Sequence, residues 1–334
     1  MSGKTALVTG ATGLLGSNLC RELVSQGWQV KGLVRSLEKA QRFLGGSGIE
    51  WIQGDIETVS TFSAALRGVD VVFHTAAFFR EYYQPGLHWE KMKRINVDAT
   101  IALFQAAEAQ GVKRAVFTSS SGVIQKDAHQ AATETAPYSQ FAEQNLYFKT
   151  KVLAEQAIYR FLETSQMDVV MILPGWMMGP GDAAPTSAGR LVLDLLAGKL
   201  PGLVDGGASL ADARDVATAM VLAAEHGKRG ERYIVTGPLT TMKDIALELE
   251  AITGVRAPRL EIPDWLALAI ASVLEKWASW TGQTNPMPLA GVQTLLEKTS
   301  LSSAKAERVL GVTFRPLKET LSDTVSWYKL HGYY

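Results

Sequence analysis

The sequence predicts an α/β protein in which a doubly wound parallel sheet is followed by a smaller, mostly helical C-terminal domain. Three observations support this prediction. In the first half of the chain, short apolar runs alternate with longer amphipathic segments, the pattern of a parallel sheet covered by helices on both faces. The first apolar run leads directly into a glycine-rich turn, TGATGLLG. After Pro174 and Gly175 the alternation ends and helical patterns dominate.

Each element is predicted from its own pattern. The short apolar runs indicate buried strands at residues 6–9, 29–34, 49–53, 69–74, 115–119 and 169–173. The amphipathic segments between them indicate helices at residues 14–26, 58–67, 88–110 and 144–165. In the second half one further strand is predicted, at 233–235. We therefore assign residues 1–174 to the sheet domain and 175–334 to a second region, with the segment near 211–236 returning to the first.

The composition indicates a small-molecule role rather than a polyanionic partner. Lys plus Arg and Asp plus Glu number 33 each among 334 residues, so no nucleic-acid-binding surface is indicated. The single cysteine, Cys20, lies in an apolar helical stretch, which excludes an intramolecular disulfide and argues against a metal-thiolate site. The histidines His74, His88, His129 and His226 lack metal-ligand spacing, so we predict no metal.

The sequence predicts a cytoplasmic protein without a membrane span. The first residues, MSGKTALVTG, run into the first strand without the segments of a signal peptide. The longest apolar run, Trp265 to Leu274, has about ten residues, whereas a spanning helix needs ~20. We expect this run to form a lid or core helix, with contact to a membrane surface as the alternative.

The glycine-rich turn predicts a dinucleotide site. Gly10, Gly13 and Gly16 stand between the first strand and the first helix, where glycine permits a tight turn and the close approach of a pyrophosphate to the helix N-terminus. This placement is typical of the Rossmann fold. Arg35 follows the second strand directly, and Lys39 comes four residues later, at the place where an acidic residue would bind the ribose of NAD. The cations favour NADP(H), with NAD(H) as the alternative, although they are also compatible with a solvated helix surface.

Two further positions are candidates for polar chemistry. Asp55, after the third strand, is suited to contact adenine or to cap a helix start. Ser119, Ser120 and Ser121 follow the fifth strand at the carboxyl edge of the sheet, where a hydroxyl can bind a substrate carbonyl, although serines are also common in turns.

A tyrosine and a lysine in LYFKTKVLAEQ form the candidate proton-transfer pair. Tyr147 and Lys151 are four residues apart and therefore share one helix face, whereas Lys149 does not. A neighbouring cation favours the phenolate and brings a tyrosine pKa of ~10 closer to neutrality. Taken alone, such a pair is also common on amphipathic helices.

The motifs together resemble the extended short-chain dehydrogenases/reductases, of the NAD-dependent epimerase/dehydratase type. TGATGLLG, GDI, HTAA, RINVDAT, FTSSSG, the Tyr147 and Lys151 pair, LPG and ADARDVA occur in the family's order over essentially the whole chain. The resemblance implies that Tyr147 is the general acid/base and that Lys151 lowers its pKa and holds the nicotinamide ribose. It assigns substrate orientation to Ser120, with Ser121 as the alternative.

The resemblance also implies the cofactor contacts. Asn96 matches an asparagine that supports the helix and the cofactor end of the site. The further positions that the motifs place against the cofactor are Thr12, Leu14, Leu15, Ile56, Thr75, Ala76, Ala77, Ser119, Pro174 and Gly175.

Two departures from the family pattern indicate the substrate class. Sugar-nucleotide enzymes of this family carry VYG after the serines and NVYGP after the sixth strand, whereas this chain has VIQ and WMMGP. Large apolar side chains thus stand where those enzymes carry the asparagine of NVYGP. Together with Trp176 and Met177, the aromatics Phe78 and Phe79, followed by Tyr82, Tyr83 and Trp89, predict an apolar pocket.

This pattern favours the branch that resembles dihydroflavonol 4-reductase, with NADPH reducing an aldehyde or ketone. The alternative is a sugar-nucleotide epimerase or dehydratase with tightly bound NAD, in which Arg190 or Arg214 contacts the diphosphate. A minor alternative is a non-catalytic dinucleotide sensor. Asp215 is predicted to cap the helix that follows it. The resemblance further implies a homodimer formed through the helices at 88–110 and 144–165.

Overall fold

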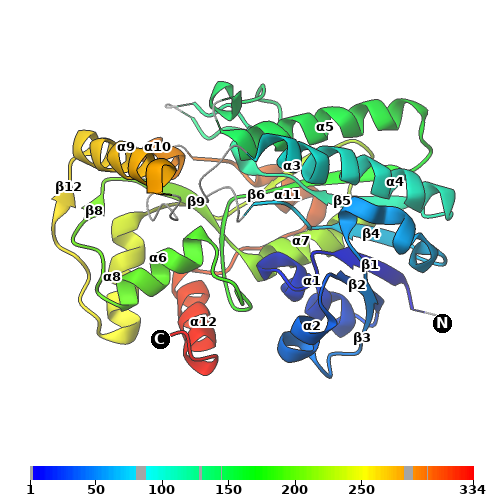
Figure 1. Cartoon of the computed structure of the whole chain (residues 1–334), viewed down its shortest axis with the longest axis horizontal. Helices are drawn as coiled ribbons and strands as arrows, with labels where there is room; N and C mark the ends of the chain where they lie inside the picture. Colours follow the sequence, from blue (N-terminus) through cyan, green and yellow to red (C-terminus); the bar gives the residue numbers. More distant parts are fainter. Residues whose placement is uncertain (1–2, 80–87, 128–129, 144, 282–288, 299) are drawn as a thin grey trace.

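The chain folds around a parallel sheet of seven strands, as predicted (Figure 1). The computed structural model describes residues 3–79, 88–127, 130–143, 145–281, 289–298 and 300–334. In spatial order the strands are β10 (Arg232–Val235), β6 (Asp168–Pro174), β5 (Arg114–Thr118), β4 (Val71–His74), β1 (Thr5–Thr9), β2 (Gln29–Val34) and β3 (Ile49–Gln53). The strand order reverses between β1 and β4, and open sheets of this kind bind ligands beyond the carboxyl ends of the strands at such a point.

Helices cover both faces of the sheet (Figure 1). One face packs against α4 (Ala99–Ala109) and α5 (Leu146–Thr164), with Phe104 and Ile158 in the core. The other packs against α1 (Leu14–Ser25) and α7 (Ala213–His226), where Leu19 and Met220 are fully buried. The central strands β1, β4, β5 and β6 are buried on both sides, which explains their continuous apolar runs, whereas the edge strand β3 is only partly buried.

Two predicted helices differ from the observed structure. The segment predicted as a helix at 58–67 forms two short 3₁₀ helices, η1 (Ile56–Thr61) and η2 (Ser63–Leu66). Thr58 inside η1 (φ −132°) and Phe62 between the two (φ −124°) depart from helical geometry. The helix predicted at 88–110 consists of α3 (Trp89–Lys93), a π-helical turn η4 (Arg94–Asp98), and α4. The predicted helix at 144–165 is observed as α5, and a short helix α2 (Leu37–Leu44) follows β2.

The second half contains more strands than the single one predicted. A three-stranded sheet joins β7 (Trp176–Met178), β9 (Gly207–Asp212) and β11 (Leu239–Thr241), and a small pair joins β8 (Leu203–Val204) and β12 (Glu261–Ile262). Near these small sheets lie α6 (Ser187–Leu196), α8 (Met242–Thr253), α9 (Asp264–Thr281), α10 (Leu289–Leu296) and α12 (Leu317–Leu330), whereas α11 (Ala304–Leu310) packs against α7 and β10. Four of these strands, β7, β8, β11 and β12, have only two or three residues, too short a run for periodicity to reveal.

Helix α9 contains the longest apolar run of the sequence. Its small residues Ala267 and Ala271 are buried, while Trp265 and Trp280 are 71% and 88% exposed. Within the described ranges, no helix has both the length and the apolar character that crossing a membrane requires.

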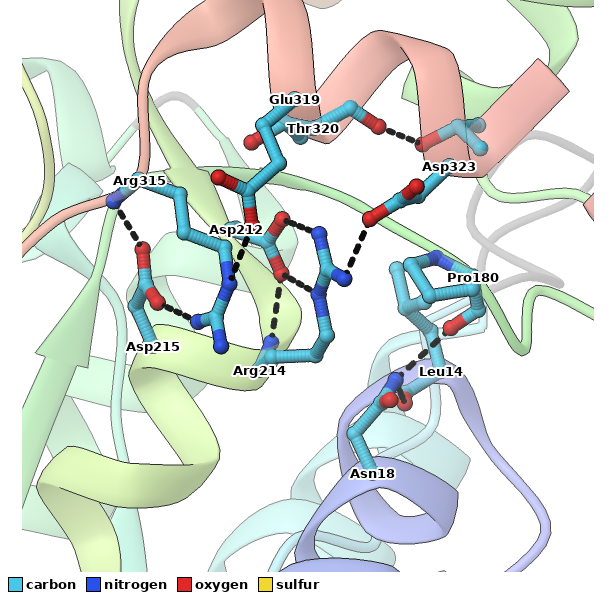
Figure 2. A network of polar contacts seen from close by, with 11 residues as sticks. Leu14, Asn18, Pro180, Asp212, Arg214, Asp215, Arg315, Glu319, Thr320 and Asp323 are labelled. Carbon is cyan, nitrogen blue, oxygen red and sulfur yellow. Dashed lines mark hydrogen bonds and ion pairs between the residues drawn. The ribbon is translucent and has the colours of Figure 1, made fainter. Parts of the chain in front are cut away.

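A polar network joins the C-terminal helix to the start of α7 (Figure 2). Asp212, and not the predicted Asp215, caps α7 by accepting a hydrogen bond from the Arg214 backbone at 2.8 Å. The prediction was wrong because Asp215 lies inside the first turn, where its carboxylate pairs with the guanidinium of Arg315 and accepts from its backbone N–H at 2.7 Å. The Arg214 guanidinium contacts Asp212 at 2.7 Å and Asp323 of α12.

A second contact in the same view connects the loop after β7 to the sheet domain (Figure 2). The Asn18 side-chain amide donates to the Pro180 carbonyl oxygen at 2.8 Å and to the Leu14 carbonyl oxygen at 2.8 Å. Through these contacts the segment that follows β7 is attached to the first turn of α1, beside the predicted dinucleotide turn.

Candidate active site

The glycine turn between β1 and α1 is built so that only glycine fits. Gly10 has φ +67°, and a Cβ there would lie 2.8 Å from the backbone nitrogen of Ala76. A Cβ on Gly16 would lie 2.1 Å from the Gly10 carbonyl oxygen. Gly13 caps α1 without a side chain, so no hydroxyl or carboxylate accepts from the first-turn N–H groups. These features fit a pyrophosphate on the helix N-terminus, whereas its contacts with Thr12, Leu14 and Leu15 stay a prediction.

The end of β4 lies against this turn. The Thr75 hydroxyl donates to the Thr9 carbonyl oxygen at 2.7 Å, and the Ala76 backbone donates to the Thr9 hydroxyl at 3.3 Å. Ala77 is exposed. The predicted cofactor segment from Thr75 to Ala77 is therefore adjacent to the glycine turn across the β1 and β4 pair.

His74 is a structural residue of the core. Its ring nitrogens hydrogen-bond the hydroxyls of Thr9 at 2.7 Å and Thr100 at 2.9 Å. Burial lowers the pKa of His74 to about 3, and the Lys151 charge acts in the same direction. In the described residues, no group of three or more His, Cys, Asp and Glu side chains is arranged to hold a metal ion.

The adenosine end of the predicted site carries exposed cations. Arg35 follows β2 and Lys39 lies in the first turn of α2; both side chains are exposed. Ser36 caps α2 by accepting from the Lys39 backbone at 3.2 Å. Asp55 caps η1 by accepting from the Glu57 backbone at 2.9 Å, and the next residue, Ile56, is buried. Contact of Asp55 with adenine stays a prediction.

Helix α5 places the candidate acid and its lysine one turn apart. The helix starts at Leu146, where the Asn145 side chain caps it by accepting from the Phe148 backbone at 3.2 Å. Lys151 Nζ lies 5.7 Å from the centroid of the Tyr147 ring. Lys149 instead pairs with Glu143 at 2.9 Å, so the two lysines of the motif have different surroundings.

Lys151 is held at the end of β5. Its Nζ donates to the Thr118 carbonyl oxygen at 2.7 Å and lies 4.9 Å above the Phe117 ring. The side chain is buried, and burial lowers the pKa of Lys151 to about 7, while the negative charge of Glu155 opposes this shift. The amine therefore exchanges its proton close to neutral pH.

The three serines that follow β5 have different environments. The Ser119 hydroxyl donates to the buried carboxylate of Glu155. Ser120 caps the short helix η5 (Ser121–Val123), its hydroxyl oxygen accepting from the Gly122 backbone at 3.2 Å. Because this bond leaves the Ser120 proton free for another acceptor, Ser120 can donate to a substrate oxygen. Ser121 lies within η5 and is half-buried.

Asn96 connects three segments of the site. Its side-chain oxygen accepts from the Phe78 backbone at 2.7 Å, and its nitrogen donates to the Phe78 carbonyl oxygen at 3.2 Å and to the Thr150 hydroxyl at 3.1 Å. With both amide ends bonded inside the protein, Asn96 positions the segment after β4 against α5. It lies in the π-helical turn η4, a local feature that apolar periodicity did not predict.

The predicted substrate residues separate into two groups. The Phe79 ring contacts the Tyr147 ring edge to face, with centroids 4.6 Å apart. Phe78 is buried instead, beneath Lys91 at 4.8 Å from its ring. Trp176 packs in the cluster around α6 and α12, and Met177 packs in the core of α7. Trp89 lies 5.5 Å from Lys149 Nζ. Tyr82 and Tyr83 lie outside the described residues.

The turn after β6 requires its glycine. A Cβ on Gly175 would lie 2.2 Å from the Thr236 hydroxyl and 2.3 Å from the Ser209 carbonyl oxygen. Pro174 ends β6, and the Gly175 backbone donates to Val235 of β10 at 3.1 Å. At Gly175 the chain therefore leaves the large sheet for β7 through a space that admits no side chain, beside the carboxyl ends of the strands.

The two arginines considered for a diphosphate have different surroundings, and contact of Arg190 with a diphosphate stays a prediction. Arg214 already binds Asp212 and Asp323, and these contacts raise its pKa. Arg190 is exposed on α6. The buried Glu155 and its partner Arg232 were not predicted; the signal for Glu155 was a carboxylate four residues after Lys151 on the same helix face.

Comparisons with known proteins are consistent with this geometry. Residues 6–236 match the NAD dependent epimerase/dehydratase family. The chain is 34% identical over 333 residues to a putative dihydroflavonol 4-reductase of Synechocystis sp., covering 98% of this chain and 95% of that protein. It is 33% identical to sterol demethylase protein B of Methylococcus capsulatus, covering 98% and 99%. The crystal structure of gox2253 superposes with a TM-score of 0.83 at 30% identity, covering 99% of both chains.

Proposed function

This chain belongs to the NAD-dependent epimerase/dehydratase family and is an NAD(P)-dependent oxidoreductase, and we propose that it is a reductase of an aldehyde or ketone on an apolar small molecule. The observation that carries this proposal is the Phe79 ring, 4.6 Å from the ring of Tyr147. An aromatic wall directly beside the proton donor suits an apolar carbonyl compound better than a sugar nucleotide. The putative dihydroflavonol 4-reductase among the relatives supports the same substrate class.

The reaction uses three side chains of this protein. When bound, NADPH supplies the hydride that goes to the carbonyl carbon. The Ser120 hydroxyl donates a hydrogen bond to the carbonyl oxygen, and the Tyr147 hydroxyl passes its proton to that oxygen to give the alcohol. The Lys151 cation favours the resulting phenolate. Tyr147 then regains a proton from solvent, which completes the cycle.

We propose NADP(H) as the preferred cofactor because of Arg35. It is exposed beyond β2, and it has no ion-pair partner in the part of the chain that the structure describes. A guanidinium at this place is suited to a 2′-phosphate, whereas NAD would be bound through an acidic residue. Lys39, one turn into α2, supports the same preference.

An epimerase or dehydratase with tightly bound NAD is the second candidate, because the matching family is described as NAD dependent epimerase/dehydratase and the resemblance implies the same tyrosine for these reactions. The first experiment is to denature freshly purified protein and identify released nucleotide by mass spectrometry. Stoichiometric NAD would favour the epimerase or dehydratase. Little bound nucleotide, with NADPH binding more tightly than NADH and reduction of members of an aldehyde and ketone panel, would support the reductase.

We also propose a homodimer formed through α4 and α5. Their outer surface contains a hollow of about 390 Å³ whose apolar lining comprises Val97, Ile101, Ala102, Leu153 and Ala157. Lys93, Asp98 and Arg160 add charged groups to the same lining. Protein interfaces likewise combine apolar and charged side chains. Sedimentation velocity, which reports the mass in solution, tests this proposal.

A further inference from the structure

A buried carboxylate follows the proposed catalytic pair along α5. Tyr147, Lys151 and Glu155 are spaced by four residues and therefore lie on one stripe of the helix. The Glu155 side chain is completely buried. Because a buried carboxylate is costly unless donors and cations compensate it, its partners indicate what it does.

The partners of Glu155 come from distant parts of the chain. The Ser119 hydroxyl donates to one carboxylate oxygen, and Arg232 Nη1 lies 3.4 Å from the other. Arg232 belongs to β10, and its guanidinium also donates to the Glu134 carbonyl oxygen and lies 5.4 Å from the Tyr138 ring. The carboxylate is thus held from two directions, by β5 and by β10.

Lys151 and Glu155 together clamp α5 to the end of β5. Lys151 Nζ donates to the Thr118 carbonyl oxygen at 2.7 Å, and the next residue, Ser119, donates to Glu155. Thr118, the last residue of β5, and Ser119 directly after it therefore bind two residues that are one helical turn apart. Ser120 follows immediately, so this clamp sets the position of the substrate-orienting serine relative to α5.

The charges around the clamp indicate an electrostatic role as well. Burial lowers the pKa of Lys151, and the opposing influence is the charge of Glu155. Burial raises the pKa of Glu155 itself, while Ser119, Arg232 and Tyr138 lower it. Tyr159 also interacts with the charge of Glu155, and the buried His74 of β4 interacts with the charge of Lys151. The only group among these that acts on Lys151 to keep it protonated is Glu155.

We propose that Glu155 is a positioning residue that maintains the positive charge of Lys151 and holds α5 against the end of β5. This inference rests on the proposed function, because the charge of Lys151 matters to the chemistry only if Tyr147 transfers the proton. Ser119 and Arg232 keep the carboxylate in place. None of these three residues contacts the substrate in this assignment.

The test is the titration of Lys151 in the whole protein without turnover. Protein labelled with ¹³C-lysine is titrated by NMR, and the Lys151 Cε resonance is assigned by its absence from Lys151→Arg. In Glu155→Gln, which keeps the side-chain shape but removes the charge, we expect the Lys151 midpoint to fall by about one pH unit or more. Equal midpoints in the wild type and Glu155→Gln would overturn the proposal.

Glu134→Gln is the matched control. Glu134 is also buried and near Arg232, but its carboxylate accepts from the Ile234 backbone at 2.8 Å and is not among the causes of the Lys151 shift. A purely structural effect would lower the melting temperature of both variants without moving the midpoint in either. If Glu155→Gln fails to fold, Glu155→Gln with Arg232→Gln removes both charges, and the midpoint is expected to move in the same direction.

The activity assay separates this inference from the proposed function. If the protein reduces carbonyl compounds, the alkaline limb of its kcat/KM profile should move to lower pH in Glu155→Gln and stay in place in Glu134→Gln. If no carbonyl compound is reduced, the proposed function fails, and the Lys151 titration still decides the role of Glu155.

Discussion

The Phe79 ring stands edge to face against the Tyr147 ring, with centroids 4.6 Å apart. Its neighbour Phe78 points into the protein and is buried. Two consecutive phenylalanines thus have different roles, one beside the proposed proton donor and one in the core. This difference makes them a matched pair for testing the predicted apolar site.

We expect Phe79→Ala to raise KM for apolar carbonyl substrates by about tenfold, because the substrate loses an aromatic contact worth roughly 1.5 kcal/mol. Phe78→Ala should instead lower the free energy of unfolding by about 3–5 kcal/mol, since it leaves a cavity in the core. Steady-state kinetics and urea unfolding of both variants measure these effects. An unchanged KM in Phe79→Ala would place the substrate elsewhere.

Replacing the candidate acid should separate chemistry from cofactor binding. Tyr147→Phe removes the only hydroxyl that we assign to proton donation, so kcat should fall by roughly 10²- to 10⁴-fold while NADPH affinity changes little. Tyr159→Phe is the control, because Tyr159 is exposed three turns further along α5. Stopped-flow kinetics and nucleotide fluorescence titration give the two quantities. Wild-type rates in Tyr147→Phe would exclude it as the acid.

The cofactor preference is tested at Arg35. Arg35→Gln should weaken NADPH binding by about 10- to 100-fold, the value of a hydrogen bond to a charged group, and leave NADH binding nearly unchanged. Arg42→Gln is the control. It removes a cation of α2 whose guanidinium carbon lies 5.5 Å from the centroid of the Phe43 ring, and it should change the affinity for neither cofactor. Dissociation constants for both nucleotides are required. If Arg35→Gln weakens the binding of NADPH and NADH equally, Arg35 does not bind the 2′-phosphate.

Lys151 predicts a pH dependence of stability. Its pKa is lowered from 10.5 to about 7 in the folded protein by burial, so between these pH values the unfolded chain binds a proton that the folded protein does not. The stability of the wild type relative to Lys151→Met should therefore rise with pH over this window, by up to roughly 4 kcal/mol. Urea unfolding of both proteins at pH 7, 8, 9 and 10 measures the difference.

Because both proteins share the remaining titrating groups, their contributions largely cancel in that comparison. A difference that stays constant from pH 7 to pH 10 would mean that the folded Lys151 keeps an ordinary pKa. In that case the amine would be solvated and the 2.7 Å contact with the Thr118 carbonyl oxygen would not be maintained in solution.

The sequence alone predicted the features that depend on local pattern. The strands of the sheet domain, the glycine turn at Gly10 and the shared face of Tyr147 and Lys151 all follow from the spacing of residues close together in the chain. The segment at 58–67 was predicted as a helix and forms 3₁₀ turns, in which Thr58 departs from helical geometry in a way that periodicity does not encode.

Only the tertiary structure decided which distant residues meet. Arg232 reaches Glu155 from a strand 77 residues away, Asp323 of α12 binds Arg214, and Asn96 joins the segment after β4 to α5. The cap of α7 is Asp212, and the carboxylate of Asp215, inside the first turn, binds Arg315, 100 residues further along. Local pattern determines which face of an element is buried, but the partner of a buried charge depends on how the elements are assembled.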